Sequence, residues 1–216
     1  MNNFTETITK LKIAFTDNPL PGEKAQLSMS PVTRKMMNEE MRRSNNGSGL
    51  KKDTRKSAVL ILFYPIDNIP HIAMIKRAPD NTVHSGQISF PGGKVEKIDG
   101  SLEATALREA NEEVGIMQES VKVIGQLTKL YIPPSNFDVF PFVGYSDSRP
   151  NFVTNHEVDK LMEVKLSDLL DANNRTYNTI THRDGNEFVV PSYSIQDEVI
   201  WGATGMILGE LMEVGL

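Results

Sequence analysis

Three glutamates in one short segment, Glu109, Glu112 and Glu113, have the types and spacing that most clearly indicate chemistry. Residues three or four positions apart are neighbours on a helix, so these carboxylates would lie close together and repel one another. A divalent cation relieves that repulsion, and Mg²⁺ prefers oxygen ligands. The spacing therefore indicates a metal site. The alternative is a solvated charged face on which Arg108 pairs with Glu112.

The residues just before this cluster favour the metal site. Pro91, Gly92 and Gly93 form a turn that leaves the backbone exposed and can bring a carbonyl oxygen to the same ion. Asp99 adds a further acid ahead of the helix. The combination is far more specific than any one of its parts.

A helix must carry the three glutamates. Ser101 is a good residue for its N-cap, and Gly115 is placed to end it. Apolar residues recur at helical spacing and predict the face that packs on the core, with Leu107 beside them: Leu102, Ala106, Ala110 and Val114.

The rest of the chain predicts an α+β fold with helices packed on a mixed sheet. Alternating and β-branched runs predict strands at 58–64, 71–76, 121–129, 137–144, 157–164, 177–183 and 187–194. The first two strands are expected to form a hairpin. Helices are predicted at 4–15, 102–114 and 203–213. We expect residues 1–56 to supply a helix and a polar loop that pack on a core domain of residues 57–216.

Composition narrows the function. The chain has 23 Lys and Arg against 28 Asp and Glu, a net charge of −5, so it lacks the basic footprint of a nucleic-acid-binding protein. It has no cysteine, which excludes disulfides and thiolate chemistry. The longest apolar run, 58–64, is too short to span a bilayer. We therefore expect a cytoplasmic protein that binds neither nucleic acid nor membrane.

The segment 86–116 resembles the Nudix box, G-x5-E-x7-R-E-U-x-E-E-x-G-U, in which U is a bulky aliphatic residue. Matching residues are Gly93, Arg108, Glu109, Glu112, Glu113, Gly115 and Ile116. Asp99 stands at the first Glu with one extra residue before Arg108, and Ala110 replaces an aliphatic residue. These departures are similar to the coenzyme A pyrophosphatase branch, whose upstream signature ends in G-x3-F-P-G-G. Residues 86–93 fit that ending, and Arg77-Ala78 fits an earlier part.

The resemblance implies a Nudix-type α/β/α sandwich with a mixed central sheet and a bound Mg²⁺ or Mn²⁺. It implies that Glu109 and Glu113 are the main metal ligands, and that Glu112 shares ligation or orients a metal-bound water. The Gly92 carbonyl is a further expected ligand. Arg108 is expected to orient the carboxylates through a bidentate pair with Asp99.

The general base has two candidates, Glu112 and Glu157; the alternative for Glu157 is an ordinary carboxylate at a strand end. Substrate contacts are expected from Arg77, Gly93, Thr82 and His84. Thr82 stands where the branch usually has Arg, and His84 either substitutes for it or is a surface loop residue.

The implied activity is hydrolysis of a phosphoanhydride bond, with coenzyme A or acyl-CoA giving 3′,5′-ADP and 4′-phosphopantetheine. The alternatives are ADP-ribose, dinucleotides or noncanonical nucleotides as substrates, and a Nudix-fold binding module without turnover. The C-terminal window 202–215 is apolar on all sides of its first half, which suggests burial or a subunit contact. Many members of the family form homodimers, so a homodimer is also expected.

Overall fold

The computed structural model describes residues 3–31, 53–79, 84–181 and 185–216, and all structural statements below refer to these residues. Most of the predicted N-terminal polar loop lies outside them, as does Thr82.

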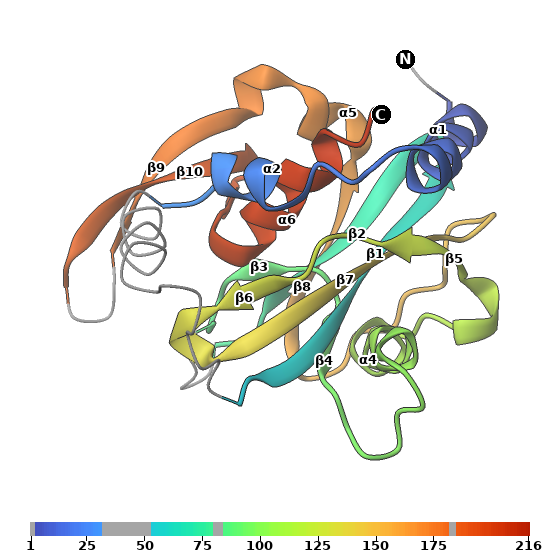
Figure 1. Cartoon of the computed structure of the whole chain (residues 1–216), viewed down its shortest axis with the longest axis horizontal. Coiled ribbons are helices and arrows are strands. Elements are labelled where there is room, and N and C mark those ends of the chain that lie inside the picture. The colour runs from blue at the N-terminus through green and yellow to red at the C-terminus, as the bar shows by residue number, and fades with distance from the viewer. Residues whose placement is uncertain (1–2, 32–52, 80–83, 182–184) are drawn as a thin grey trace.

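A mixed eight-stranded sheet forms the centre of the molecule (Figure 1). Its central strand β1 (Arg55–Ile66) pairs antiparallel with β2 (Ile69–Arg77) and parallel with β7 (Phe137–Tyr145). Asp67 and Asn68 both adopt positive φ between β1 and β2, so the predicted hairpin and its tight turn are confirmed. The other strands are β3 (Ile88–Ser89), β4 (Gly92–Lys94), β5 (Lys122–Gln126), β6 (Leu130–Ile132) and β8 (Val158–Lys165).

The two faces of this sheet belong to two separate cores because side chains alternate along β1. Ile61 and Phe63 pack in one core, with α1 (Phe4–Asp17) and α6 (Gly202–Met212). Leu60 and Leu62 pack in the other, with α4 (Leu102–Val114). The helices thus cover opposite faces, which is the predicted α/β/α arrangement (Figure 1).

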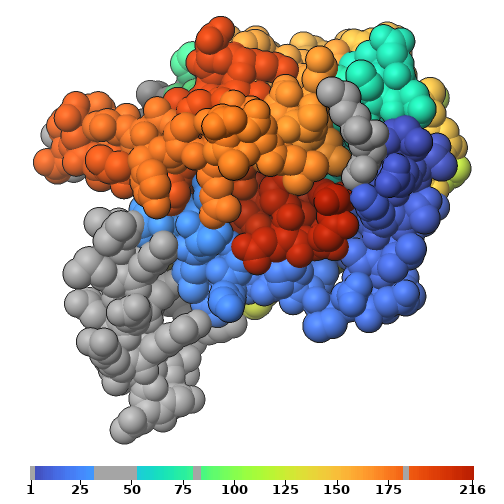
Figure 2. All heavy atoms as spheres, turned by 90° about the horizontal axis from the view of Figure 1, so that it is seen from above, coloured from blue at the N-terminus to red at the C-terminus, as the bar shows by residue number. Residues whose placement is uncertain are grey.

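A second sheet of three strands, in the order β11-β10-β9, contributes to the first core. These strands are β9 (Arg175–Thr181), β10 (Glu187–Ile195) and β11 (Glu198–Ile200). The β9–β10 hairpin reaches outward beyond the main body (Figure 2). The short helices are α2 (Gly22–Ser28) and α5 (Leu166–Leu170), with 3-10 turns η1 (Gln118–Ser120), η2 (Pro133–Ser135) and η3 (Ala172–Asn174).

Most predicted elements are confirmed in type and place, with some corrections. The strand expected at 121–129 ends at Gln126, and a separate strand follows at β6. Five short elements were not predicted: α2, β3, β4, β11 and α5. Each is too short to show a helical or strand periodicity of apolar residues. Ile13 is 51% exposed because it lies off the buried face of α1. Most of α6 is buried within this chain, which accounts for its apolar surface on all sides.

None of the helices in the described ranges has the length and apolar character needed to cross a membrane.

Candidate active site

The helix α4 places the acidic residues at the edge of the sheet. The Ser101 side chain accepts a hydrogen bond from the Ala104 N–H at 3.0 Å, and Gly115 ends the helix with a φ of 72°. Both predicted caps are therefore confirmed. Ala106, Ala110 and Val114 are fully buried against the sheet, which fixes how far the helix can rotate. Glu109 and Glu113 then face the turn that contains Gly92 and Gly93.

Glu113 is the most deeply buried of the three glutamates, with 3% of its side chain exposed. Its carboxylate accepts a hydrogen bond from the Gly92 N–H at 2.8 Å and one from Arg77 at 3.3 Å. Burial raises the pKa of Glu113 to about 7, although the Gly92 N–H and the Arg77 charge act against this increase. The charges of Glu109 and Glu157 raise it further. A bound cation would favour the Glu113 anion and so lower this pKa.

Glu109 lies directly against the glycine turn. A Cβ at Gly93 would fall 2.4 Å from the Glu109 carboxyl carbon, so only glycine leaves room for this carboxylate. Burial raises the pKa of Glu109, while an ion pair with Arg108 at 3.0 Å lowers it. Gly92 is equally constrained, since a Cβ there would meet the Ala58 carbonyl oxygen at 2.4 Å.

Arg108 connects the helix to the loop before it. Its guanidinium forms two hydrogen bonds with Asp99, at 2.8 Å and 3.0 Å, and one with the Lys94 carbonyl at 3.1 Å. The bidentate pair predicted from the sequence is present. The Arg108 hydrogen bonds are the main reason that the pKa of Asp99 lies well below its usual range. Arg108 also pairs with Glu112 at 3.1 Å, which is the contact expected for the alternative charged face.

Glu157 approaches the cluster from another part of the chain. It directly precedes β8, its backbone carbonyl accepts from the Ala78 N–H at 2.8 Å, and its carboxylate pairs with Arg77 at 3.7 Å. Its charge is felt by both Glu109 and Glu113. Arg77, Glu113 and Glu157 therefore meet in one site although they are far apart in the sequence.

The donors in this site suit a hard divalent cation, since carboxylate oxygens surround a glycine turn with no room for side chains. As the side chains stand, no three acidic or histidine residues among those described converge closely enough to hold a metal. Glu112 is engaged with Arg108, and 53% of its side chain is exposed. A three-carboxylate site thus requires Glu112 to change rotamer, which an exposed side chain can do readily.

Of the remaining predicted substrate contacts, His84 is among the described residues. His84 is in the turn before β3, where a ring nitrogen lies 3.2 Å from the Gln87 side-chain oxygen. Thr82 is outside the described residues. Asn155 was missed by the sequence reading: its N–H donates to the Glu113 carbonyl at 3.0 Å, and its side chain accepts from the Glu157 N–H at 2.8 Å. An Asn two residues before Glu157 is a turn signal, but only the fold shows which helix it contacts.

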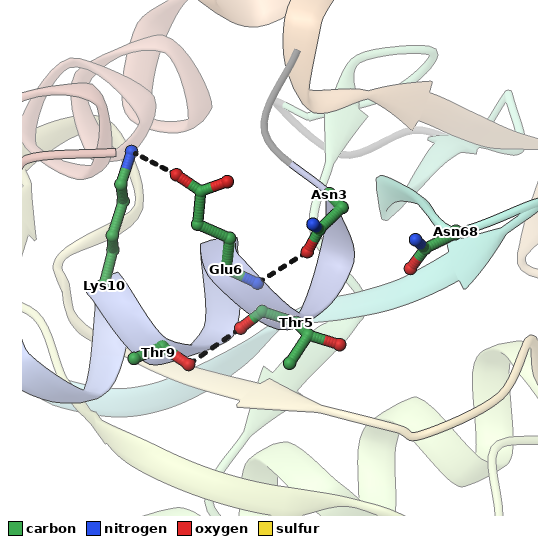
Figure 3. Close-up of a pocket in the computed structure, with 6 residues that line it drawn as sticks. All are labelled: Asn3, Thr5, Glu6, Thr9, Lys10 and Asn68. Carbon is green, nitrogen blue, oxygen red and sulfur yellow. Dashed lines mark hydrogen bonds and ion pairs between the residues drawn. The ribbon is translucent and has the colours of Figure 1, made fainter.

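A hollow near the N-terminus has no comparable chemistry (Figure 3). Asn3 lies there and accepts a hydrogen bond from the Glu6 N–H at 2.9 Å, as the N-cap of α1. Lys10 pairs with Glu6 at 3.4 Å one turn later. These contacts stabilise the first turns of α1. None of the α4 glutamates lines the hollow.

The fold and the site together define an α/β/α protein that holds an acidic helix against a glycine turn at the edge of a mixed sheet. Comparisons with known proteins agree. Residues 54–183 match the family model for the NUDIX domain. A Photorhabdus laumondii protein named "Uncharacterized Nudix hydrolase NudL" is 35% identical over 162 residues, covering 74% of this chain and 86% of its own. The protein of the same name from Pectobacterium atrosepticum is 37% identical over 160 residues, covering 73% and 81%.

A solved structure is similar in fold. The MutT/nudix family protein from Enterococcus faecalis aligns with 95% of this chain and 73% of its own, with a TM-score of 0.51 and 14% sequence identity. The chain belongs to the Nudix hydrolase family. It is a pyrophosphohydrolase, and enzymes of this family generally use divalent metal ions.

Proposed function

We propose that this enzyme hydrolyses the pyrophosphate bond of coenzyme A or acyl-CoA. Water supplies an oxygen to one phosphorus, the P–O bond of the anhydride breaks, and the products are 3′,5′-ADP and 4′-phosphopantetheine. Phosphoryl transfer of this kind depends on positioning and charge neutralisation. The proposed cofactor, Mg²⁺ or Mn²⁺, supplies charge neutralisation and an activated water when bound.

One observation carries the proposal. The Gly92 N–H donates to the Glu113 carboxylate, so the G-x3-F-P-G-G segment and the Nudix box meet in a single site. The part of the sequence that resembles the coenzyme A branch is therefore in contact with a proposed metal ligand. A signature placed elsewhere in the fold would say nothing about the substrate.

In this proposal each residue has a distinct task. Glu109, Glu113, Glu112 and the Gly92 carbonyl hold the metal. Arg108 fixes the helix to the loop through Asp99 and keeps the carboxylates oriented. Gly93, whose missing side chain leaves room for the Glu109 carboxylate, contacts the substrate through its backbone.

Glu157 is the proposed general base. It faces the cluster from outside the box and remains half exposed, so it can reach a water and release a proton to solvent. Glu112 is the other candidate. The variants Glu157→Gln and Glu112→Gln separate the two candidates. Loss of the base lowers kcat at saturating Mg²⁺, whereas loss of a metal ligand raises the Mg²⁺ concentration needed for half-maximal rate.

Thr82 supports a second candidate function, the hydrolysis of a different nucleotide. The coenzyme A branch usually has Arg at this position, where it could contact phosphate, and this chain has Thr instead. The alternative substrates are ADP-ribose, dinucleotides and noncanonical nucleotides. A substrate panel with Mg²⁺ and with Mn²⁺, with products identified by mass, decides between them. Release of 3′,5′-ADP from coenzyme A is the expected result. Ready turnover of ADP-ribose or NADH with coenzyme A untouched would overturn the proposal, and no turnover of any substrate would favour a binding module.

A further inference from the structure

The loop that joins β7 to β8 carries Glu157, and it runs along the C-terminal end of α4. The Val153 N–H donates to the Val114 carbonyl at 3.1 Å, and the Asn155 N–H donates to the Glu113 carbonyl at 3.0 Å. Both carbonyls lie in the last turn of α4, where the helix itself supplies no donor. The loop therefore completes the end of the helix that carries the proposed metal ligands.

Asn155 contacts the backbone of Glu113 and the backbone of Glu157. Its N–H donates to the Glu113 carbonyl, and its side-chain oxygen accepts from the Glu157 N–H at 2.8 Å. Its own carbonyl accepts from the N–H of Val158, the first residue of β8, at 3.3 Å. Asn and Asp side chains accept in this way from the backbone two residues further on, and they stabilise a turn there. One residue therefore links a proposed metal ligand to the proposed base.

The Glu157 carboxylate itself is weakly restrained. It lies 3.7 Å from the nearest Arg77 nitrogen, which is longer than a hydrogen bond, and 51% of its side chain is exposed. An exposed ion pair of this kind orients a carboxylate poorly. The position of Glu157 thus depends on its backbone, which the Ala78 N–H and the Asn155 side chain hold. Of these two contacts, only the one from Asn155 is made by a side chain and is removed by a substitution.

We propose that Asn155 is a positioning residue for hydrolysis, which holds Glu157 where it can take a proton from the attacking water. This inference rests on the proposed function, in which Glu157 is the general base. A general base acts only within hydrogen-bond reach of the proton that it removes. A displacement of about 1 Å can lower the rate of an enzyme about a hundredfold. Asn155 therefore acts through Glu157 and contacts neither the water nor the substrate.

Asn155→Ala removes the side-chain acceptor and keeps the backbone N–H that bonds to Glu113. We expect kcat at saturating Mg²⁺ to fall about tenfold or more, because the base is displaced. The KM and the Mg²⁺ concentration for half-maximal rate should change less than about twofold, because the substrate and metal contacts remain. A parental kcat in a folded Asn155→Ala enzyme would overturn the inference, as would a loss that saturating Mg²⁺ restores.

Asn151→Ala is the matched control, since it makes the same change at an exposed position of the same loop and should leave kcat unaltered. Thermal melts establish that the variants fold. Asn155→Ser offers an uncharged hydroxyl that accepts more weakly than the amide oxygen, so its kcat should lie between those of the parent and Asn155→Ala. A kcat for Asn155→Ser no higher than that of Asn155→Ala would contradict the inference. If Asn155→Ala does not fold, Asn155→Ser takes its place.

A double-mutant cycle with Glu157→Gln distinguishes positioning of the base from a general disturbance of the site. Glu157→Gln alone should lower kcat about a hundredfold, since a general base contributes about 10²- to 10⁴-fold. Asn155→Ala in the Glu157→Gln background should lower kcat by less than about a further twofold, because the residue that Asn155 positions is already inactive. The full loss in that background would show that Asn155 acts through another residue and would overturn the inference.

The same cycle separates this inference from the proposed function. Rates are measured with coenzyme A, or with ADP-ribose if the substrate panel shows that ADP-ribose is hydrolysed instead. If Glu157→Gln lowers kcat and Asn155→Ala does not, the inference fails and Glu157 remains the base. If Glu157→Gln keeps the parental kcat, the assignment of the base fails and the inference fails with it, whichever substrate is hydrolysed.

Discussion

Glu113 illustrates how burial changes what one carboxylate can do. At the protein surface it would be an ordinary anion, but here it is buried between Gly92 and Arg77. The same burial that raises its pKa makes a bound cation valuable, because water cannot stabilise the charge there. A metal ligand is therefore the role that we propose for Glu113.

Glu113→Gln should lower kcat by about 10²- to 10³-fold, since a metal site supplies several kcal/mol of charge stabilisation and each 1.36 kcal/mol is a factor of ten. Steady-state rates at saturating Mg²⁺ measure the effect. Glu103→Gln makes the same change in an exposed residue of the same helix and should leave the rate unaltered. Equal rates for both variants would show that Glu113 has no role in catalysis.

Gly93→Ala tests the contact between the turn and Glu109. The new methyl group would fall 2.4 Å from the Glu109 carboxyl carbon, so the flexible carboxylate must move while the backbone stays in place. We expect kcat/KM to fall at least tenfold with little change in thermal stability. Gly100→Ala is the control, because a Cβ there meets no atom within 4 Å. A fully active Gly93→Ala enzyme would show that the position of Glu109 is not critical.

At the scale of elements, the loop before α4 is held by the pair of Arg108 and Asp99. The pKa of Asp99 is lowered in the folded chain, so its contribution to stability is present above the unfolded value of about 3.9 and is lost as pH falls towards the folded value. Asp99→Asn should therefore cost roughly 1.5–3 kcal/mol near pH 7. The difference from the parent chain should shrink below about pH 4. Urea unfolding of the parent chain and of Asp99→Asn at pH 7, 5, 4 and 3 measures the loss of stability and its pH dependence. A loss of stability that is the same at every pH would argue against an ion pair of Asp99 with Arg108.

The helices α2 and α6 are joined by a buried carboxylate. Glu210 is fully buried, and it accepts hydrogen bonds from the N–H groups of Gly22 and Thr128 and from the Gln26 side chain. Glu210→Ala leaves these donors buried without an acceptor and should cost about 3 kcal/mol or more. Glu213→Ala removes an exposed glutamate near the same helix end and should change stability by less than about 0.5 kcal/mol. Chemical denaturation measures the stability of both variants. A Glu210→Ala chain as stable as the parent would show that Glu210 does not hold α2 and α6 together.

At the scale of the whole molecule, α1 lies before the matched region 54–183 but packs in the same core as the sheet. Leu11→Ala should therefore destabilise the entire domain by about 2–5 kcal/mol, since Leu11 is completely buried. Ile13→Ala, on the exposed face of the same helix, should have little effect. Unfolding followed by a probe in the sheet is the required measurement. If both substitutions change the free energy of unfolding equally little, α1 does not contribute to the stability of the core.

The sequence by itself determined the features that depend on neighbouring residues. Ser101, Gly115 and the apolar stripe of α4 defined the helix because caps and periodicity act within a few turns. The pair of Arg108 and Asp99 was expected from the resemblance to the Nudix box, whose residues lie close together in the sequence. The β-branched and aromatic run at 58–64 likewise predicted a strand, although not which side chains joined which core.

The tertiary structure decided every contact between distant segments, because these depend on how the sheet brings strands together. Arg77 meets Glu157 because β2 pairs with β8, and it meets Glu113 because α4 packs on the same face of the sheet. Glu210 meets Gly22 across 188 positions, with no local signal in either segment. The glutamate cluster can therefore be predicted from the local sequence, whereas the burial of Glu113 and its pairing with Arg77 arise only when the chain folds.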